Sequence, residues 1–193
     1  MANGGRYLGF CLGGYLAGHD PGYSLLAPND NAVQEIEEPG SQVQDEDDTI
    51  IQVDWEFSTG TNKGEKARGR WMYFQDGVAL ALGKESPAVV LGRYSSTGDV
   101  AALLSPFGRG WVGCVGPHPE ADQSWCMFVV SRLLESVSFA DDLADDDEEI
   151  ENPDGIHFDI GHDFVRAVID APLGSVADEG ESSTVVPSTS GPI

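Results

Sequence analysis

The chain has 193 residues, 40% of them hydrophobic, which is enough for one globular domain with a sizeable core. Its 33 acidic and 10 basic residues give a formal net charge of −23. This charge repels nucleic-acid phosphates and anionic lipids, so we expect no nucleic acid and no membrane as a partner. No apolar run approaches the roughly 18 residues that span a bilayer, and no signal peptide is visible. The compartment and the oligomeric state stay open.

The predicted elements begin with a strand that is followed directly by a helix. Residues 6–10 form a mostly apolar run that is predicted to be a buried strand, and residues 12–18 begin a helical pattern, with Cys11 between them and glycines on both sides. Residues 21–48 are predicted to be mostly loop. Residues 50–57 largely alternate apolar and polar side chains, and this period of two indicates a half-buried strand.

Short strands with tight connections are predicted for the middle of the chain. Residues 60–69 contain three glycines and three basic residues, which indicates an exposed turn. The strands predicted after it are separated by glycine or proline and span residues 71–75, 78–82, 88–94, 100–104 and 111–115. Short strands in close succession favour antiparallel hairpins.

The last part of the chain combines two predicted helices with an acidic segment. Residues 127–140 carry apolar side chains at helical spacing, which indicates an amphipathic helix. Residues 141–151 are nearly all acidic and are predicted to be a solvated loop. Residues 163–170 are predicted to form a short helix with an apolar face made of Phe164, Val165, Val168 and Ile169.

Changes in composition define the domain organisation. We predict one domain over residues 1–172, with an acidic insertion at about 127–151. The remaining residues, 173–193, are rich in Ser, Thr, Gly, Pro and acidic side chains, so we predict a disordered tail.

The three cysteines cannot all pair within one chain, so at least one thiol is free and a disulfide scaffold is not expected. Cys114 lies inside a predicted strand and is expected in the core. Cys11 has two interpretations. In the first, Cys11 is a nucleophile. An ordinary thiol with a pKa near 8.5 supplies little thiolate at neutral pH, but the start of a helix after a strand favours the anion. The neighbouring glycines permit the strained backbone of a nucleophile elbow. The same pattern fits a small buried cysteine whose neighbouring glycines ease packing.

A candidate partner for the thiol lies in residues 116–122, GPHPEAD. His118 follows the predicted strand 111–115, so it lies at the sheet edge where ligands bind in open α/β folds. Glu120 is two residues further on and is placed to orient the imidazole, as the third member of a catalytic triad does. The alternative is an exposed, proline-rich turn.

Together, GFCLGGYLAG and GPHPEAD resemble the nucleophile and His-x-Glu segments of class I glutamine amidotransferase-like domains. They are similar in particular to the amidotransferase-like domain at the N-terminus of eukaryotic biotin–protein ligases and to stand-alone fungal proteins related to it. The resemblance covers most of residues 4–170. The further stretches that carry it are residues 5–10, 51–55, 91–94 and 152–156.

This resemblance implies a flavodoxin-like three-layer α/β sandwich, an amide-cleaving activity and no cofactor or metal. The catalytic residues that it implies are the nucleophile Cys11, the general base His118 and the orienting residue Glu120. The oxyanion and substrate-binding residues that it implies are Leu12, Gly13 and Gly9. In the working enzymes the cysteine attacks a small-molecule amide and releases ammonia, and water then hydrolyses the thioester.

The chain departs from the family pattern at three places. Tyr15 stands where the glutamine amidotransferases carry a glutamine, four residues after the nucleophile. The family places two or three strand–helix units ahead of the nucleophile, so we expect those units and one oxyanion donor to be missing and a sheet edge to be unpaired. Residues 127–149 match no family segment. Two functions therefore stay open: a cysteine hydrolase, and a catalytically inactive relative with a binding or regulatory role.

A weaker candidate is the segment at residues 157–163, HFDIGHD, whose two imidazoles and two carboxylates are potential metal ligands. Their spacing matches no strong zinc pattern. Ordinary packing, with helix capping by Asp163 or its neighbour, is the alternative. We expect no metal here.

Overall fold

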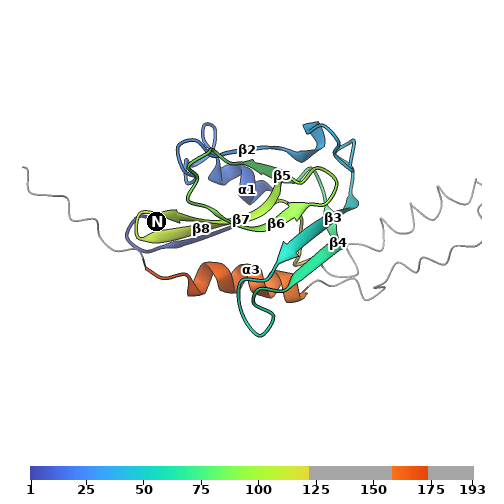
Figure 1. Cartoon of the computed structure of the whole chain (residues 1–193). Coiled ribbons are helices and arrows are strands. Elements are labelled where there is room, and N and C mark those ends of the chain that lie inside the picture. The colour runs from blue at the N-terminus through green and yellow to red at the C-terminus, as the bar shows by residue number, and fades with distance from the viewer. Residues whose placement is uncertain (122–157, 174–193) are drawn as a thin grey trace, which may run out of the picture.

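The computed structural model describes residues 1–121 and 158–173 (Figure 1). The predicted helix at 127–140, the acidic insertion, Cys126, His157 and the tail beyond residue 173 lie outside the described residues. The described part of the chain is a mixed α/β structure with one curled sheet of eight strands and few helices.

The sheet has the strand order β1-β8-β7-β6-β3-β4, with β5 pairing with β7 and β2 pairing with β5. The strands are β1 (Arg6–Phe10), β2 (Asn31–Gln34), β3 (Thr49–Glu56), β4 (Lys66–Phe74), β5 (Val78–Ala81), β6 (Val89–Tyr94), β7 (Val100–Phe107) and β8 (Gly110–Val115). The helices are α1 (Leu12–Ala17), the short 3-10 helix η1 (Glu35–Glu37) and α3 (Phe158–Asp170).

Within the described residues, β1 and β8 form the single parallel pair, and the other strand pairs are antiparallel. The predicted antiparallel section in the middle of the chain is therefore confirmed. The predicted strand and helix on either side of Cys11 are also confirmed, as β1 and α1, but the prediction that the strand is buried was wrong, because only Gly9 of β1 is buried and Leu8 is 37% exposed. No described strand pairs with the second edge of β1, so this edge of the sheet is open among the described residues.

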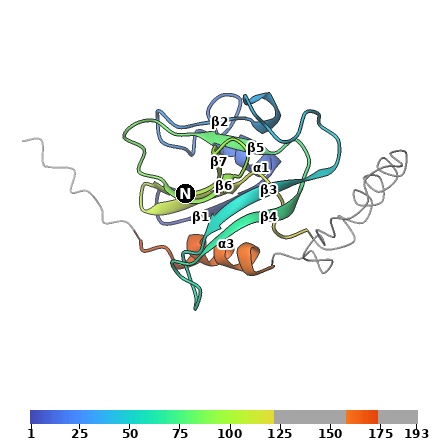
Figure 2. The same cartoon turned by 45° about the vertical axis from the view of Figure 1, so that its right-hand side comes forward.

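The two faces of the sheet carry separate hydrophobic clusters, and a helix covers each of them. Figure 1 and Figure 2 show α1 on one side of the sheet and α3 on the other. The α3 side is the larger cluster and includes the fully buried Phe164, whereas the α1 side includes the buried Cys114. Gly113 of β8 lets α3 approach closely, because a Cβ atom there would lie 2.2 Å from Cγ2 of Val168.

Two segments that were predicted as loop or turn contain strands instead. Residues 21–48 include β2 and η1, because the four residues of β2 pair with β5, which is more than 40 positions away in sequence. Residues 60–69 include the start of β4. Two of the three basic side chains there pair with acidic ones on β3: Arg68 with Asp54, and Lys66 with Glu56, which lies opposite it with Oε2 3.0 Å from Nζ.

Helix α3 begins at Phe158, five residues before the predicted start. The prediction of its buried face was partly wrong, because Ile169 is 56% exposed. Asp163 lies inside the helix rather than at its cap and is 4% exposed. The residues that bury the helix against the sheet are Ile160, Phe164, Ala167 and Val168.

The curl of the sheet brings the end of β4 to the segment that follows β8. An isolated antiparallel bridge joins Tyr73 to His118, whose backbone N–H donates to the Tyr73 carbonyl at 2.9 Å. The ends of β1, β4 and β8 therefore meet at one place. No helix among the described residues is both long enough and apolar enough to cross a membrane.

Candidate functional site

Cys11 occupies the sharp turn between β1 and α1. Its backbone has φ 46° and ψ −109°, a conformation that is strained for a residue with a side chain. Its N–H donates to the Val115 carbonyl at 2.8 Å, which fixes the turn to the end of β8. The thiol is partly exposed, and its Sγ lies 3.3 Å from the carbonyl oxygen of Gln75.

His118 lies three residues after β8 and contacts both predicted partners. Its Nδ1 is 2.8 Å from Oε1 of Glu120, and its imidazole forms a hydrogen bond with the Cys11 side chain. The Tyr73 ring packs edge-on against the imidazole with the ring centroids 5.5 Å apart. The structure therefore brings together the three residues that the sequence singled out, although they span 109 positions (120 − 11) of the chain. Their catalytic roles stay a prediction.

The pKa of His118 results from opposing effects. Burial lowers it, but the hydrogen bonds with Cys11 and Glu120 and the charges of both partners raise it, so that the pKa is about 9. The ring is therefore mostly protonated at neutral pH. Because this pKa exceeds the ordinary value of about 6.5, the stabilisation by the imidazolium is complete below pH 6.5 and is lost as the pH rises through 9.

This titration gives the first prediction. In the intact chain the His118 ring should titrate near pH 9, and Glu120→Gln should lower its pKa because the variant loses the carboxylate charge. Proton NMR of the imidazole across pH 5–10 measures both values. His162, an exposed histidine on α3, serves as an internal reference in the same spectra. A His118 pKa that is the same in the two proteins would contradict the assigned contact.

The turn at residues 75–77, between β4 and β5, borders the thiol of Cys11. Asp76 has φ 43°, and its two carboxylate oxygens each accept from Nε2 of Gln34 at 3.2 Å. Tyr15 donates its hydroxyl to the Gly77 carbonyl at 3.2 Å. Burial and then the charge of Asp76 raise the pKa of Tyr15. The turn is thus held by Cys11 on one side and by Tyr15 on the other.

The predicted oxyanion residues differ in exposure. Leu12 is 65% exposed at the start of α1, and Gly13 is partly exposed beside it. The first turn of a helix leaves such N–H groups without intrahelical acceptors, so both are available as donors. Gly9 is buried in β1, where a Cβ atom would lie 2.5 Å from the Gly13 carbonyl oxygen. The absence of a side chain at Gly9 is therefore needed for packing α1 on β1.

The other reactive residues lie away from this site or take structural roles. Cys114 is fully buried in β8, and burial raises its pKa to about 12. Asp163, part of the weaker metal candidate, accepts hydrogen bonds from Trp55 and from the loop after β3. Across residues 1–121 and 158–173, no three His, Cys, Asp or Glu side chains are grouped so that they could hold a metal ion.

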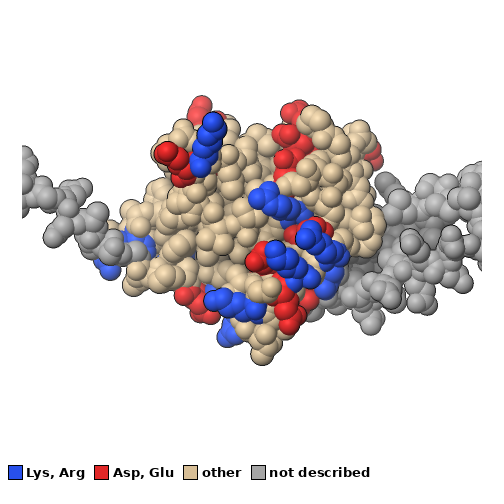
Figure 3. Space-filling model, viewed as in Figure 1, with Lys and Arg blue, Asp and Glu red and all other residues tan. Residues whose placement is uncertain are grey.

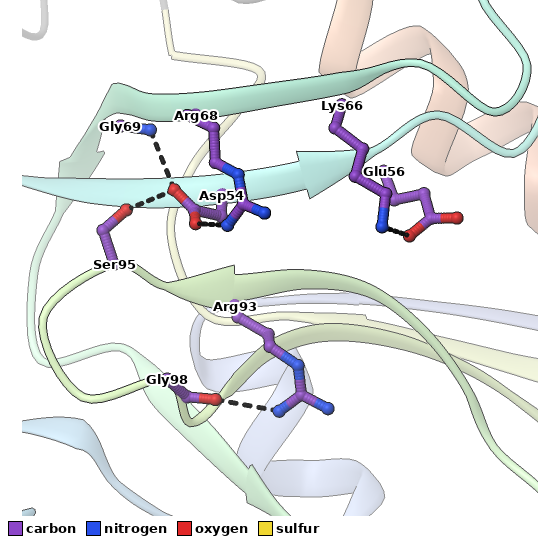
Figure 4. A network of polar contacts seen from close by, with 8 residues as sticks. All are labelled: Asp54, Glu56, Lys66, Arg68, Gly69, Arg93, Ser95 and Gly98. Carbon is purple, nitrogen blue, oxygen red and sulfur yellow. Dashed lines mark hydrogen bonds and ion pairs between the residues drawn. The ribbon is translucent and has the colours of Figure 1, made fainter.

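A separate groove of about 340 Å³ lies between β3, β4 and β6. Basic and acidic side chains gather together on this part of the surface (Figure 3). Asp54 forms an ion pair with Arg68 and accepts from the Gly69 N–H and the Ser95 hydroxyl, each at 2.9 Å (Figure 4). Partial burial raises the pKa of Asp54, but these contacts hold it below the usual range.

The remaining charges of this groove are also engaged. Lys66 pairs with Glu56 at 3.0 Å, and Arg93 donates from Nη1 to the Gly98 carbonyl at 2.8 Å (Figure 4). Because these side chains bind one another or the backbone, we interpret the groove as a polar network that joins three strands. The better-supported candidate is the site at Cys11.

Sequence reasoning missed the contribution of the β4–β5 turn. The signal available was the pair Asp76-Gly77 between two predicted strands, which is typical of a turn. Its position beside Cys11 results from the curl of the sheet, which no local pattern indicates. A scan against protein-family models and a search of curated protein sequences found no match to the chain.

Proposed function

We propose that the protein is an amidotransferase-like cysteine hydrolase that cleaves a small amide through a thioester on Cys11. The observation that carries this proposal is the position of His118, whose imidazole binds the Cys11 side chain and the Glu120 carboxylate at once. In nucleophilic catalysis by a triad, the base contacts the nucleophile on one side and the orienting group on the other.

The backbone of Cys11 supports the same proposal. A residue with positive φ and ψ of −109° costs of the order of 1–3 kcal/mol, and glycine would adopt this conformation with less strain. A cysteine with only a structural role would not require this strained backbone conformation. A strained turn between a strand and a helix is also the form of the nucleophile elbow, which exposes the attacking atom.

The protonated His118 defines the starting state of the reaction. With a pKa of about 9, the imidazole is an imidazolium at neutral pH, and Nδ1 is engaged by Glu120. An imidazolium hydrogen-bonded to a cysteine favours the thiolate, which is the nucleophilic form. The imidazolium of His118 also carries the proton that a general acid gives to the leaving group.

The reaction proceeds in two halves. The Cys11 sulfur attacks the amide carbonyl carbon, the carbonyl oxygen takes the electron pair of the C=O bond, and the N–H groups of Leu12 and Gly13 are in place to stabilise it. His118 gives its proton to the amide nitrogen, the C–N bond breaks, and ammonia leaves a thioester. His118 then removes a proton from water, the resulting hydroxide attacks the thioester, and the C–S bond breaks to release the acid.

The proposal includes a class I amidotransferase-like, flavodoxin-like origin for the fold. The parallel pair of β1 and β8 supports it, because Cys11 and His118 follow the carboxyl ends of these two strands. Helices on opposite faces of the sheet are compatible with a three-layer sandwich (Figure 1).

Alkylation of the thiols tests the proposed function without a known substrate. At pH 6, iodoacetamide should label Cys11 at least about a hundredfold faster than Cys114, because burial raises the pKa of Cys114 to about 12. His118→Ala should slow labelling of Cys11 by about tenfold or more, because the imidazolium is lost. Mass spectrometry of the peptides that carry each cysteine measures the rates.

His162→Ala is the matched control, because it removes an exposed imidazole from α3 and should leave the rate at Cys11 unchanged. Equally slow labelling of Cys11 and Cys114, unaffected by His118→Ala, would contradict the proposal. That outcome would instead support a catalytically inactive relative with a binding or regulatory role.

A further inference from the structure

Asp76 lies between two contacts that define the surroundings of the thiol. The carbonyl of the preceding residue, Gln75, is 3.3 Å from the Cys11 sulfur, and the carbonyl of the following residue, Gly77, accepts from Tyr15 at 3.2 Å. Tyr15 lies in α1, four residues after Cys11. The backbone of Asp76 is therefore held beside the nucleophile from both directions.

The Asp76 carboxylate is fixed in place, and within residues 1–121 and 158–173 no cationic side chain forms an ion pair with it. Its two oxygens share one neutral donor, Nε2 of Gln34, at 3.2 Å each. The ion pairs between described residues involve other carboxylates, namely Glu56, Asp54, Asp159 and Glu120. Asp76 is partly exposed. It thus presents negative charge to solvent from the residue that follows Gln75, whose carbonyl contacts the Cys11 sulfur.

The charge of Asp76 contributes to the raised pKa of Tyr15. After burial, Asp76 contributes most to the raised pKa of the Tyr15 phenol, ahead of Cys11 and of Glu37 and Glu35. All four of these groups are negative when ionised. An anionic substrate would be repelled here, whereas a substrate with a positive group would gain a partner.

We propose that Asp76 determines substrate specificity by binding a positively charged group, such as an ammonium, on the amide that Cys11 attacks. This inference rests on the proposed function of Cys11. Asp76 does not take part in bond making. Its carboxylate orients the cationic end of the substrate so that the scissile carbonyl lies at the sulfur.

Charged thiol reagents of matched size test this inference directly. The cationic probe is 2-(trimethylammonio)ethyl methanethiosulfonate, and the anionic probe is 2-sulfonatoethyl methanethiosulfonate. With each probe, the Cys11 thiolate forms a disulfide with the reagent sulfur and methanesulfinate leaves. The ratio of the two rates at Cys11, divided by the same ratio for free 2-mercaptoethanol, isolates the local electrostatic preference.

We expect the normalised ratio to favour the cation and to fall about tenfold in Asp76→Asn, which removes the charge of the residue next to Gln75, whose carbonyl lies at the sulfur. Asparagine tolerates positive φ, so the turn conformation is retained. Glu85→Gln is the matched control. It removes one charge from an exposed residue beyond the opposite end of β5, and should change the ratio less than about twofold.

The outcomes separate the two proposals. Suppose that labelling of Cys11 is rapid and depends on His118, but the normalised ratio is the same in the intact protein and in Asp76→Asn. This result would overturn the inference and leave the proposed function standing. Slow labelling of Cys11 by both probes would contradict the proposed function. A normalised ratio near one in the intact protein at low salt would overturn the inference even if the variant failed to fold.

Discussion

Replacing Cys11 by serine is expected to reduce ammonia release from an amide substrate by at least about a thousandfold. The hydroxyl is a much weaker nucleophile than the thiolate, and an imidazolium at His118 does not deprotonate it. The structure should change little, because the side chain is partly exposed and serine preserves its shape. A coupled assay of ammonia release over a panel of small amides, with and without an ammonium group, measures the effect.

Cys114→Ala is the control for this experiment. Cys114 is fully buried in β8 and lies in the cluster on the α1 face, so the variant removes a thiol without touching the proposed triad. It should retain most of the activity. Ammonia release that survives Cys11→Ser would exclude the proposed mechanism.

Replacing Asp163 by alanine is expected to destabilise the fold by about 3 kcal/mol. Its carboxylate accepts from Trp55 Nε1 at 2.9 Å, from the Thr59 N–H and hydroxyl at 2.7 Å each, and from the Ser58 N–H at 3.0 Å. The alanine variant leaves these donors without their acceptor, and Trp55 is 1% exposed. Urea unfolding followed by circular dichroism measures the loss.

Asp159→Ala is the matched substitution on the same helix. Asp159 is exposed and pairs with Arg70 at 3.2 Å, so its removal should cost less than about 1 kcal/mol. Similar losses in the two variants would show that Asp163 does not hold α3 to the loop after β3 in the way described.

The sequence predicted much of the sheet because local patterns determine it. Alternation and glycine or proline punctuation located β3, β5, β6 and β8, each within about two residues at either end. These signals failed for β2, which has four residues and depends on pairing with β5. They also failed at the start of β4, where Lys66 and Arg68 look like turn residues until their partners on β3 are known.

The chemistry of the residues predicted the triad of the candidate site, but the sequence did not indicate the turn that lies beside it. A thiol on a strand-to-helix turn needs an imidazole, and the chain offers His118 directly after the strand that pairs with β1. That reasoning could not find Asp76 or Gln75. Gln75 reaches the thiol, with Asp76 next to it in the turn, because the sheet curls until β4 meets the segment after β8, a long-range result of packing.

The bridge between Tyr73 and His118 has a consequence for partly opened molecules. Within the described residues β4 has one strand neighbour, β3, so it belongs to the less protected part of the sheet and should fray before the centre does. Its departure would break the hydrogen bond between the His118 N–H and the Tyr73 carbonyl, which fixes the backbone of the imidazole-bearing residue. Under the proposed function, opening of this part of the sheet would therefore lower the reactivity of the Cys11 thiol until the sheet closes again.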